Sequence, residues 1–204
     1  MKKGILFLLL MFVTMSNFSQ TARGYFEKGK SKDNLGNYSG AIDDYTEAIL
    51  LDPKFESAYY YRAIAKGLLG DNEGSIADYT KLIALGKMFS RASYVYQARG
   101  ISKQILGDYR GSIVDFTKAI SLGTGVNPEN YLARGTSKGM LKDYVGAIAD
   151  FTIVISYVPT KEAYYGRGVA NLALHKKNSA CLDFSKAGEL GNKEAYEYIQ
   201  KYCN

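Results

Sequence analysis

The chain has 204 residues, of which 26 are lysine or arginine, 20 are aspartate or glutamate and one is histidine, and its formal net charge is +6 at pH 7. Removal of residues 1–19, which hold two lysines and no acid, lowers this charge to +4, well short of a nucleic-acid-binding composition. The one histidine, His175, lies at a predicted turn, so we expect neither a histidine-based triad nor a multi-histidine metal site. The sequence therefore predicts no enzyme, no cofactor and no nucleic-acid partner.

Residues 1–19 have the layout of a secretory signal peptide. Lys2 and Lys3 form a basic start, residues 5–15 are an apolar run, and residues 16–19 are small and polar apart from one phenylalanine. The apolar run is about half of the roughly twenty residues that a bilayer-spanning helix needs. We therefore predict a cleaved signal peptide, export without an integral membrane anchor, and location in a bacterial periplasm, with a surface or secreted form also open.

The rest of the chain repeats a marker, an aspartate followed by an aromatic residue and then threonine or serine. The five marker aspartates are Asp44, Asp78, Asp115, Asp150 and Asp183, which stand 34, 37, 35 and 33 residues apart. A tyrosine stands nineteen residues before every marker aspartate, and a glycine or alanine stands fifteen residues before it. A period in this range, with apolar positions one helical turn apart, predicts an all-α solenoid of paired helices.

This pattern resembles the tetratricopeptide repeat (TPR). The first unit carries the family's aromatic, Leu-Gly, small and closing proline positions at Tyr25, Gly29, Leu35, Gly36, Tyr38, Ala41, Tyr45, Ala48 and Pro53. The resemblance implies one TPR domain over residues 20–204, made of five helix-turn-helix repeats and a capping helix at 195–203. The repeats cover residues 22–55, 56–92, 93–127, 128–160 and 161–194. Repeat two is three residues longer than the pattern, and residues 186–192 resemble the related Sel1-type repeat.

Glycines mark the expected turns and helix ends. Repeats one to three have a glycine at the internal turn, namely Gly36, Gly70 and Gly107. Repeat five has His175 at the same place. Three predicted second helices are followed by a glycine that we expect to be left-handed, namely Gly86, Gly123 and Gly191.

A basic residue stands sixteen residues before every marker aspartate. In repeats two to five it is an arginine, and the predicted ion pairs are Arg62–Asp78, Arg99–Asp115, Arg134–Asp150 and Arg167–Asp183. Repeat one has Lys28 there. Because the spacing faces a cation on the first helix toward an acid on the second, we interpret these pairs as structural. The alternative is an anion-binding row, to which lysines one helical turn later would add, namely Lys32, Lys66, Lys103 and Lys138.

The resemblance also implies a concave peptide-binding groove lined by the first helix of each repeat. The matching positions are Phe26, Lys30, Tyr60, Ile64, Tyr94, Gln97, Ile101, Gln104, Leu132, Thr136, Tyr165 and Val169. This apolar and aromatic lining with a few amides suits a helix or an extended segment. The alternative is that some of these side chains pack against neighbouring repeats.

A module that binds a peptide or protein segment in this groove is therefore our first hypothesis. The second is a structural subunit of a cell-envelope assembly, which would use its convex face or its ends. A carrier of a small anionic ligand or an enzyme is the third, and the oligomeric state stays open. The charged clamp with which some family members hold a C-terminal carboxylate is not matched, because Phe26, Tyr61, Tyr94 and Ala98 stand at its positions.

Cys181 and Cys203 are the only cysteines of the chain. The helix that carries Cys181 and the final helix should form an antiparallel hairpin about Gly191 and Asn192, which places both cysteines at its open end. An oxidising compartment permits a bond there. We therefore predict a disulfide, with two separate thiols as the alternative.

Overall fold

The structure is a computed structural model that describes residues 21–86 and 91–203. In these two ranges every regular element is a helix, so the predicted all-α class is confirmed. None of the helices in these ranges is long and apolar enough to span a membrane. The predicted signal peptide at 1–19 lies outside the described residues. The chain divides into two compact units, Met1–Phe89 and Ser90–Asn204, at the end of the longer repeat two.

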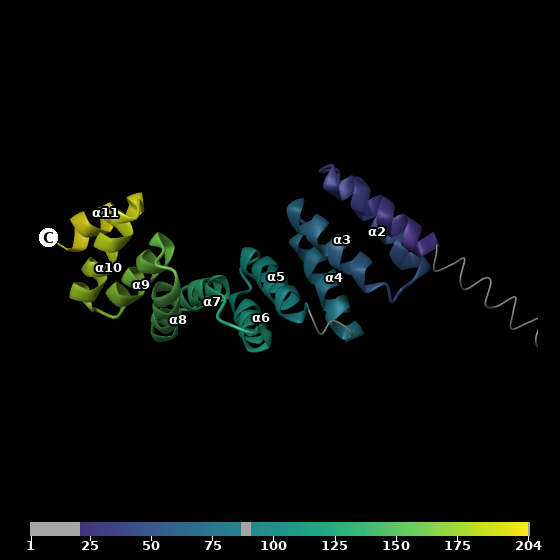
Figure 1. Cartoon of the computed structure of the whole chain (residues 1–204). Coiled ribbons are helices and arrows are strands. Elements are labelled where there is room, and N and C mark those ends of the chain that lie inside the picture. The colour runs from purple at the N-terminus through teal and green to yellow at the C-terminus, as the bar shows by residue number, and fades with distance from the viewer. Residues whose placement is uncertain (1–20, 87–90, 204) are drawn as a thin grey trace, which may run out of the picture. The chain divides into compact units, whose positions relative to one another are not determined.

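The first unit contains repeats one and two (Figure 1). Residues 21–34 form a helix that packs on α2 (Tyr38–Leu51), where a Cβ atom added to Gly29 would lie 2.7 Å from a ring carbon of Tyr45. The next hairpin is α3 (Glu56–Leu68) followed by α4 (Asn72–Leu85), and α3 packs against both α2 and α4. Helical hairpins thus stack in chain order within this unit.

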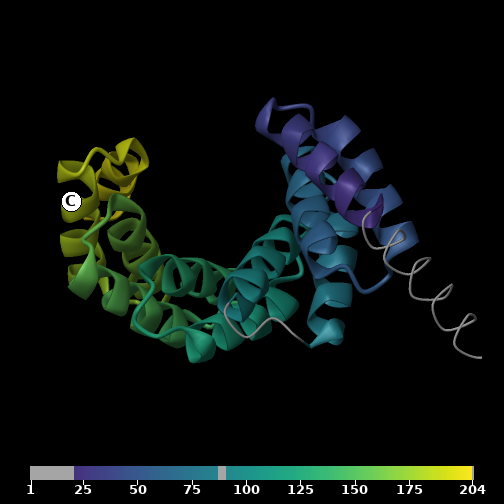
Figure 2. The same ribbon diagram turned by 45° about the vertical axis from the view of Figure 1, so that its right-hand side comes forward.

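The second unit contains repeats three to five and the final helix (Figure 2). Its helices are α5 (Ala92–Ile105), α6 (Tyr109–Leu122), α7 (Pro128–Met140), α8 (Tyr144–Tyr157), α9 (Lys161–Ala173), α10 (Lys177–Glu189) and α11 (Lys193–Tyr202). Each of them packs against the next, and α7 also touches both α5 and α9. The first helices of successive repeats therefore share one face of the unit, as the predicted solenoid of helix-turn-helix repeats requires.

Small residues on the first helix and aromatic rings on the second form the core of each repeat. A Cβ atom at Gly168 would lie 2.7 Å from a ring carbon of Phe184, and one at Gly100 would lie 3.0 Å from Phe116. Both rings are fully buried. The glycines thus let the two helices of a hairpin approach closely enough to seal the ring between them.

Four of the second helices begin with the same hydrogen bond. The side-chain oxygen of the residue before the helix accepts from the backbone N–H group three residues later, which satisfies a donor that the first turn leaves unpaired. These capping residues are Asn37, Asp71, Asp108 and Asp143. In repeat five the position is taken by Lys176, whose side chain makes no such bond.

The residue before each of these helix caps has a positive φ angle. In repeats one to three it is a glycine, with φ between 76° and 83°. The same position holds Lys142 in repeat four, with φ 65°, and His175 in repeat five, with φ 59°. The turn therefore keeps its left-handed geometry where a side chain strains it by about 1 kcal/mol relative to glycine.

The glycines expected at the helix ends behave in two ways. Gly86 has φ 73° and Gly191 has φ 88°, as expected for a left-handed helix end. The expectation is wrong for Gly123, which has φ −71° and ψ 147°. The chain leaves α6 in an extended conformation there, because it runs on through four more residues before Pro128 opens α7.

Candidate functional site

A row of buried aspartates joins the two helices of each repeat. In repeat three the guanidinium of Arg99 holds both carboxylate oxygens of Asp115, with Nε–Oδ2 at 2.9 Å and Nη2–Oδ1 at 2.7 Å. Lys103 Nζ lies 2.8 Å from the same Oδ2. Repeats two, four and five have the same two-pronged arrangement, in the pairs Arg62–Asp78, Arg134–Asp150 and Arg167–Asp183. We call this row the ion-pair ladder.

The ladder also ties successive repeats together. Arg62 Nη1 donates to the hydroxyl of Thr46 in repeat one, and Arg134 Nη1 donates to that of Thr117 in repeat three. Arg167 does the same with Thr152 of repeat four. Each ladder arginine further lies over the tyrosine three residues before it, with the guanidinium carbon 5.3 to 5.7 Å from the ring centroid. These contacts favour the structural interpretation of the arginine row over an anion-binding one.

Repeat one forms its part of the ladder with two lysines. Lys28 Nζ lies 3.2 Å from Asp44 Oδ1, and Lys32 Nζ lies 2.6 Å from Oδ2. Burial of the Asp44 carboxylate raises its pKa, but hydrogen bonds and charges from Lys32 and Lys28 outweigh burial. The net result is a pKa below the usual value. The folded state thus favours the ionised carboxylate.

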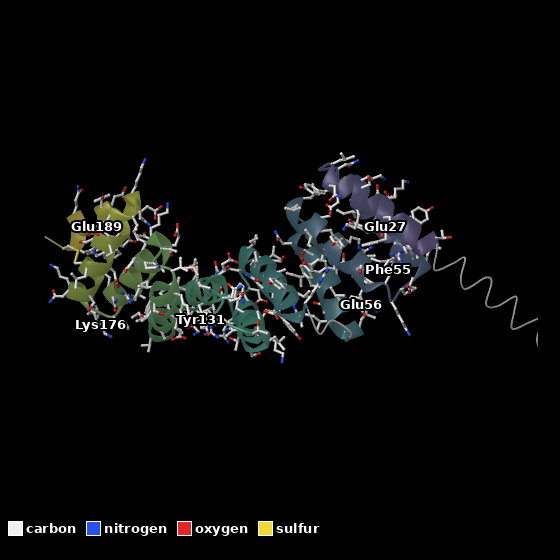
Figure 3. The ribbon with its side chains drawn as sticks, in the orientation of Figure 1. Glu27, Phe55, Glu56, Tyr131, Lys176 and Glu189 are labelled. Carbon is white, nitrogen blue, oxygen red and sulfur yellow. A yellow bond between two sulfur atoms is a disulfide. The ribbon has the colours of Figure 1, made fainter. Side chains whose placement is uncertain are left out.

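Phe26, the first predicted groove position, packs against aromatic rings inside the first unit. The ring of Phe26 is only 8% exposed and lies 5.0 to 5.8 Å from those of Tyr45, Phe55 and Tyr61. A hollow of about 340 Å³ opens beside it, and its lining includes Glu27 and Phe55, which are labelled in Figure 3. These contacts correspond to the alternative that some groove positions pack within or between repeats.

The other three groove positions of this unit are half-buried. Lys30 Nζ lies 4.7 Å from the ring centroid of Tyr61, and the Tyr60 ring meets those of Tyr61 and Tyr79 edge-on. Burial raises the pKa of the Tyr79 phenol, and charges from Tyr60 and Asp78 raise it further. Ile64 completes the set on α3. This part of the predicted groove is therefore an aromatic cluster with little free surface.

The groove positions of α5 divide into exposed apolar residues and bridging amides. Tyr94 is 62% exposed and Ile101 is 43% exposed. Gln97 donates to a carboxylate oxygen of Glu129 at 3.3 Å. Gln104 donates to the backbone oxygen of Ala133 at 3.0 Å and to the Ser137 hydroxyl at 2.9 Å. The two amides thus join the first helices of repeats three and four.

The last four groove positions meet at one pocket of about 600 Å³. Leu132 and Thr136 reach it from α7, and Tyr165 and Val169 reach it from α9. The remaining lining residues are Gly139, Met140, Tyr144, Phe151, Glu162, Gly166, Ala170, Asn192 and Glu194. We call this cavity the α7–α9 pocket. Its volume and its largely apolar lining are those of a site for one or two bulky apolar side chains.

A single glycine lets an aromatic ring approach α9 in the wall of the α7–α9 pocket. Gly166 stands where repeats three and four have alanine, and a Cβ atom there would lie 2.6 Å from Cζ of Phe151. The Phe151 ring therefore lies against the backbone of α9 and forms part of the pocket wall. Sequence reasoning did not identify Gly166, although the loss of a side chain at this one repeat position was a visible signal.

Tyr165 is fixed in the pocket wall by the C-terminal helix. Its ring lies 6.0 Å from that of Phe184 and meets the Tyr198 ring edge-on at 5.6 Å. Burial raises the pKa of the Tyr165 phenol, and hydrogen bonds with Tyr198 and Glu194 raise it further. Tyr165 is thus held neutral and in place, so that its exposed edge is a preformed part of the pocket.

The C-terminal helix is joined to repeat five by a disulfide between Cys181 and Cys203, whose Cα atoms are 5.7 Å apart. The bond crosses the open end of the hairpin formed by α10 and α11. Beneath it, Ala180, Phe184 and Ala195 form a core cluster, and the partly buried Tyr198 packs on that cluster. The final helix therefore covers the apolar end of repeat five, on the side where it also supplies Glu194 to the pocket.

Comparisons with known proteins agree with this geometry. A family model described as a tetratricopeptide repeat matches residues 22–55. A crystal structure of the MamA protein shares 23% identity, covers 90% of this chain and 96% of its own, and superposes with a TM-score of 0.77. YrrB, described as a TPR protein with an unusual peptide-binding site, shares 16% identity over 87% of this chain and 90% of its own, with a TM-score of 0.79.

A third solved structure has a ligand. The first TPR of Spaghetti (RPAP3), bound to the HSP90 peptide SRMEEVD, shares 25% identity over 60% of this chain and 94% of its own, with a TM-score of 0.55. No curated protein matches the chain in sequence. The fold thus defines an α-solenoid protein of paired helices. More narrowly, residues 22–55 match the tetratricopeptide repeat, and the chain has the fold of solved tetratricopeptide repeat proteins. These comparisons do not extend to the Sel1-type end, which stays a prediction.

Proposed function

We propose that this chain is an exported protein-interaction module that binds a peptide or protein segment in a concave groove along its first helices. The observation that carries the proposal is the α7–α9 pocket, at which Leu132, Thr136, Tyr165 and Val169 meet. Binding sites for peptides combine a deep apolar anchor pocket with a few polar groups that fix orientation. The peptide-binding site named for YrrB and the peptide complex named for Spaghetti support this use of the fold.

The exposed side chains of α5 extend the proposed groove. Tyr94 and Ile101 offer apolar surface. Their spacing places them on the face of α5 that carries Gln97 and Gln104, which bond to α7. The bound segment would therefore insert its main anchor between α7 and α9 and make shallower contacts along α5. The aromatic cluster of the first unit is left out of this binding surface, since its rings are occupied by one another.

Export is supported by two features that are independent of the groove. The layout of residues 1–19 favours a signal peptide. The disulfide of Cys181 and Cys203 suits an oxidising compartment such as a bacterial periplasm. A fusion of residues 1–19 to a reporter that is active only outside the cytoplasm tests this part, and a silent fusion would refute it.

Capture of partners from a cell-envelope extract tests the binding function. The bait is residues 20–204, beside a variant that carries Leu132→Ala and Val169→Ala. The matched control is Val145→Ala, a residue that is 69% exposed on α8 and outside the pocket lining. We expect a partner that the parent and the control retain and the pocket variant loses, with unchanged helicity by circular dichroism.

The opposite outcome has a definite meaning. A partner that all three baits retain equally would refute binding at the pocket. It would transfer the function to the convex face or to the ends of the solenoid, as expected for a structural subunit of an envelope assembly.

A further inference from the structure

The charged residues at the rim of the α7–α9 pocket carry one sign. Of its lining residues, the two that are charged at neutral pH are Glu162 and Glu194, and both are exposed. Glu162 is the second residue of α9, and Glu194 is the second residue of α11. Both glutamates therefore lie at the N-terminal end of their helix. The chain as a whole is basic, with a formal net charge of +6. The pocket is therefore an acidic site on a basic protein.

A third glutamate continues this line of charges. Glu129 occupies the second position of α7 and is exposed, and its carboxylate accepts the hydrogen bond from Gln97 on α5. The three glutamates thus stand at equivalent positions of α7, α9 and α11. We call Glu129, Glu162 and Glu194 the acidic row. Its last two members line the α7–α9 pocket.

Nearby cations do not cancel this charge. Each of the last two glutamates follows a lysine, and Lys161 Nζ lies 3.9 Å from Glu162 Oε1 with both side chains about half exposed. An exposed pair at that distance holds its partners weakly. Glu194 and Tyr165 both line the pocket, and the hydrogen bond and charge of Glu194 help to raise the pKa of the Tyr165 phenol, after burial and Tyr198.

A helix-stabilising role accounts for only part of the pattern. An acidic residue in the first turn interacts favourably with the helix dipole, and that explains a glutamate at each of these positions. It does not explain why two of them line an apolar cavity of about 600 Å³ that has no lysine or arginine among its described lining residues. A ligand in the cavity would therefore lie near two carboxylates, with no lysine or arginine among the described lining residues.

We propose that the partner of the α7–α9 pocket is a basic peptide segment: an aliphatic or aromatic side chain enters the pocket while a lysine or arginine beside it pairs with Glu162 and Glu194. This inference rests on the proposed peptide-binding function and names the class of its partner. Charge complementarity gives such a segment its orientation and speeds its encounter with the site. An acidic segment would be repelled at the same rim.

Selection from a library of short random peptides displayed on phage tests the partner class. The targets are residues 20–204 and a Glu162→Gln, Glu194→Gln variant, with Glu189→Gln as the matched control. Glu189 is exposed at the end of α10, outside the pocket lining, and is labelled in Figure 3. Enriched peptides are then synthesised, and their Kd values are measured by fluorescence anisotropy.

The expected result is enrichment of apolar residues with a lysine or arginine close by. Binding should weaken roughly five- to tenfold in the double glutamine variant and less than about twofold in the control. Added salt should weaken binding to the parent more than binding to the double variant. Thermal unfolding of each variant separates a loss of helix stability from a loss of affinity.

Two other outcomes separate the failure of this inference from that of the proposed function. In the first, the enriched peptides lose binding with Leu132→Ala and Val169→Ala, but they contain no excess of lysine or arginine and bind the double glutamine variant as well as the parent. This result would refute a basic partner and would still support peptide binding at the pocket. In the second, no peptide is enriched, or the enriched peptides bind the alanine variant and the glutamine variant as tightly as the parent. Either result would refute both proposals.

Discussion

The first and the last repeat build the same buried aspartate into two different environments. Asp44 in repeat one is held by lysines, and the Lys28 side chain is 61% exposed. Asp183 in repeat five is held by both prongs of Arg167, whose side chain is 22% exposed. Arg167 also reaches Thr152 of the preceding repeat.

This difference shows what arginine contributes to the ladder. Its planar guanidinium can donate to a carboxylate in its own repeat and to a hydroxyl in the one before, whereas a lysine ammonium acts as a compact charge on a flexible stem. Where a preceding repeat has a threonine to offer, arginine thus joins two repeats with one side chain. Repeat one needs only to neutralise its own carboxylate.

Removal of the buried aspartate from each of the two repeats should give the largest difference in stability between them. Asp183→Ala leaves Arg167 facing a buried space without its carboxylate, and we expect a loss of about 3–5 kcal/mol in the free energy of unfolding. Asp44→Ala leaves two lysines of which one is largely solvated, so we expect only about 1–2 kcal/mol. Urea denaturation followed by circular dichroism measures both. Equal losses would show that the two environments are equivalent.

Loss of the disulfide should be the next largest effect, and it acts only on the last repeat. Cys181→Ser with Cys203→Ser removes a link between residues 22 positions apart, which should cost about 2–4 kcal/mol. We expect hydrogen exchange to accelerate in α10 and α11 while the helix at 21–34 and α2 keep their protection. Acceleration that spreads equally over repeat one would contradict a local effect of the disulfide.

Substitutions at the internal turns of repeats one and five should change the stability by a smaller amount. His175→Gly relieves a side chain at φ 59° and should raise the free energy of unfolding by about 0.5–1 kcal/mol. Gly36→Ala introduces a side chain at φ 76° and should lower it by about 1 kcal/mol. Thermal unfolding of both variants checks the signs. A destabilised His175→Gly would mean that the imidazole makes a contact worth more than the strain.

Acid titration of Asp44 in repeat one should give the smallest effect. Because the folded state lowers the pKa of Asp44, the ionised carboxylate adds stability at pH values above its unfolded pKa of about 4. That contribution is lost as the pH falls through the lower folded value. The stability difference between the parent and Asp44→Asn should therefore shrink as the pH falls below about 4. A difference that is independent of pH would argue against the ionised pair.

Much of the fold follows from the repeat period alone. The marker aspartates and the tyrosines nineteen residues before them give the phase of every hairpin, and a spacing of sixteen residues sets Arg167 opposite Asp183. The periodic first-helix positions also include the four groove residues that meet at the pocket. The period could not reveal the pocket itself, because its shape depends on residues outside the pattern, such as Gly166 and Met140.

Non-local contacts account for the rest. Phe26 and Tyr165 occupy the same repeat position, yet Phe26 is buried among three rings while Tyr165 keeps an edge toward the pocket. The neighbours that decide this include Tyr61 of repeat two for Phe26 and Tyr198 of the final helix for Tyr165, which stand at different distances along the chain. The division of the chain after Phe89 likewise arises from how contacts are distributed, which the repeat pattern alone does not show.

The hydrogen bonds that Arg134 and Arg167 donate to a threonine of the preceding repeat have a consequence for how such a chain can change length. Thr117 and Thr152 stand at the same place in successive repeats and receive the same kind of hydrogen bond. If residues 128–160 were excised, Arg167 would meet Thr117 in place of Thr152 and would still find Asp183 in its own repeat. Every buried charge would keep its partner, so a chain built this way can gain or lose whole units by duplication and deletion without an unpaired ion at the joint.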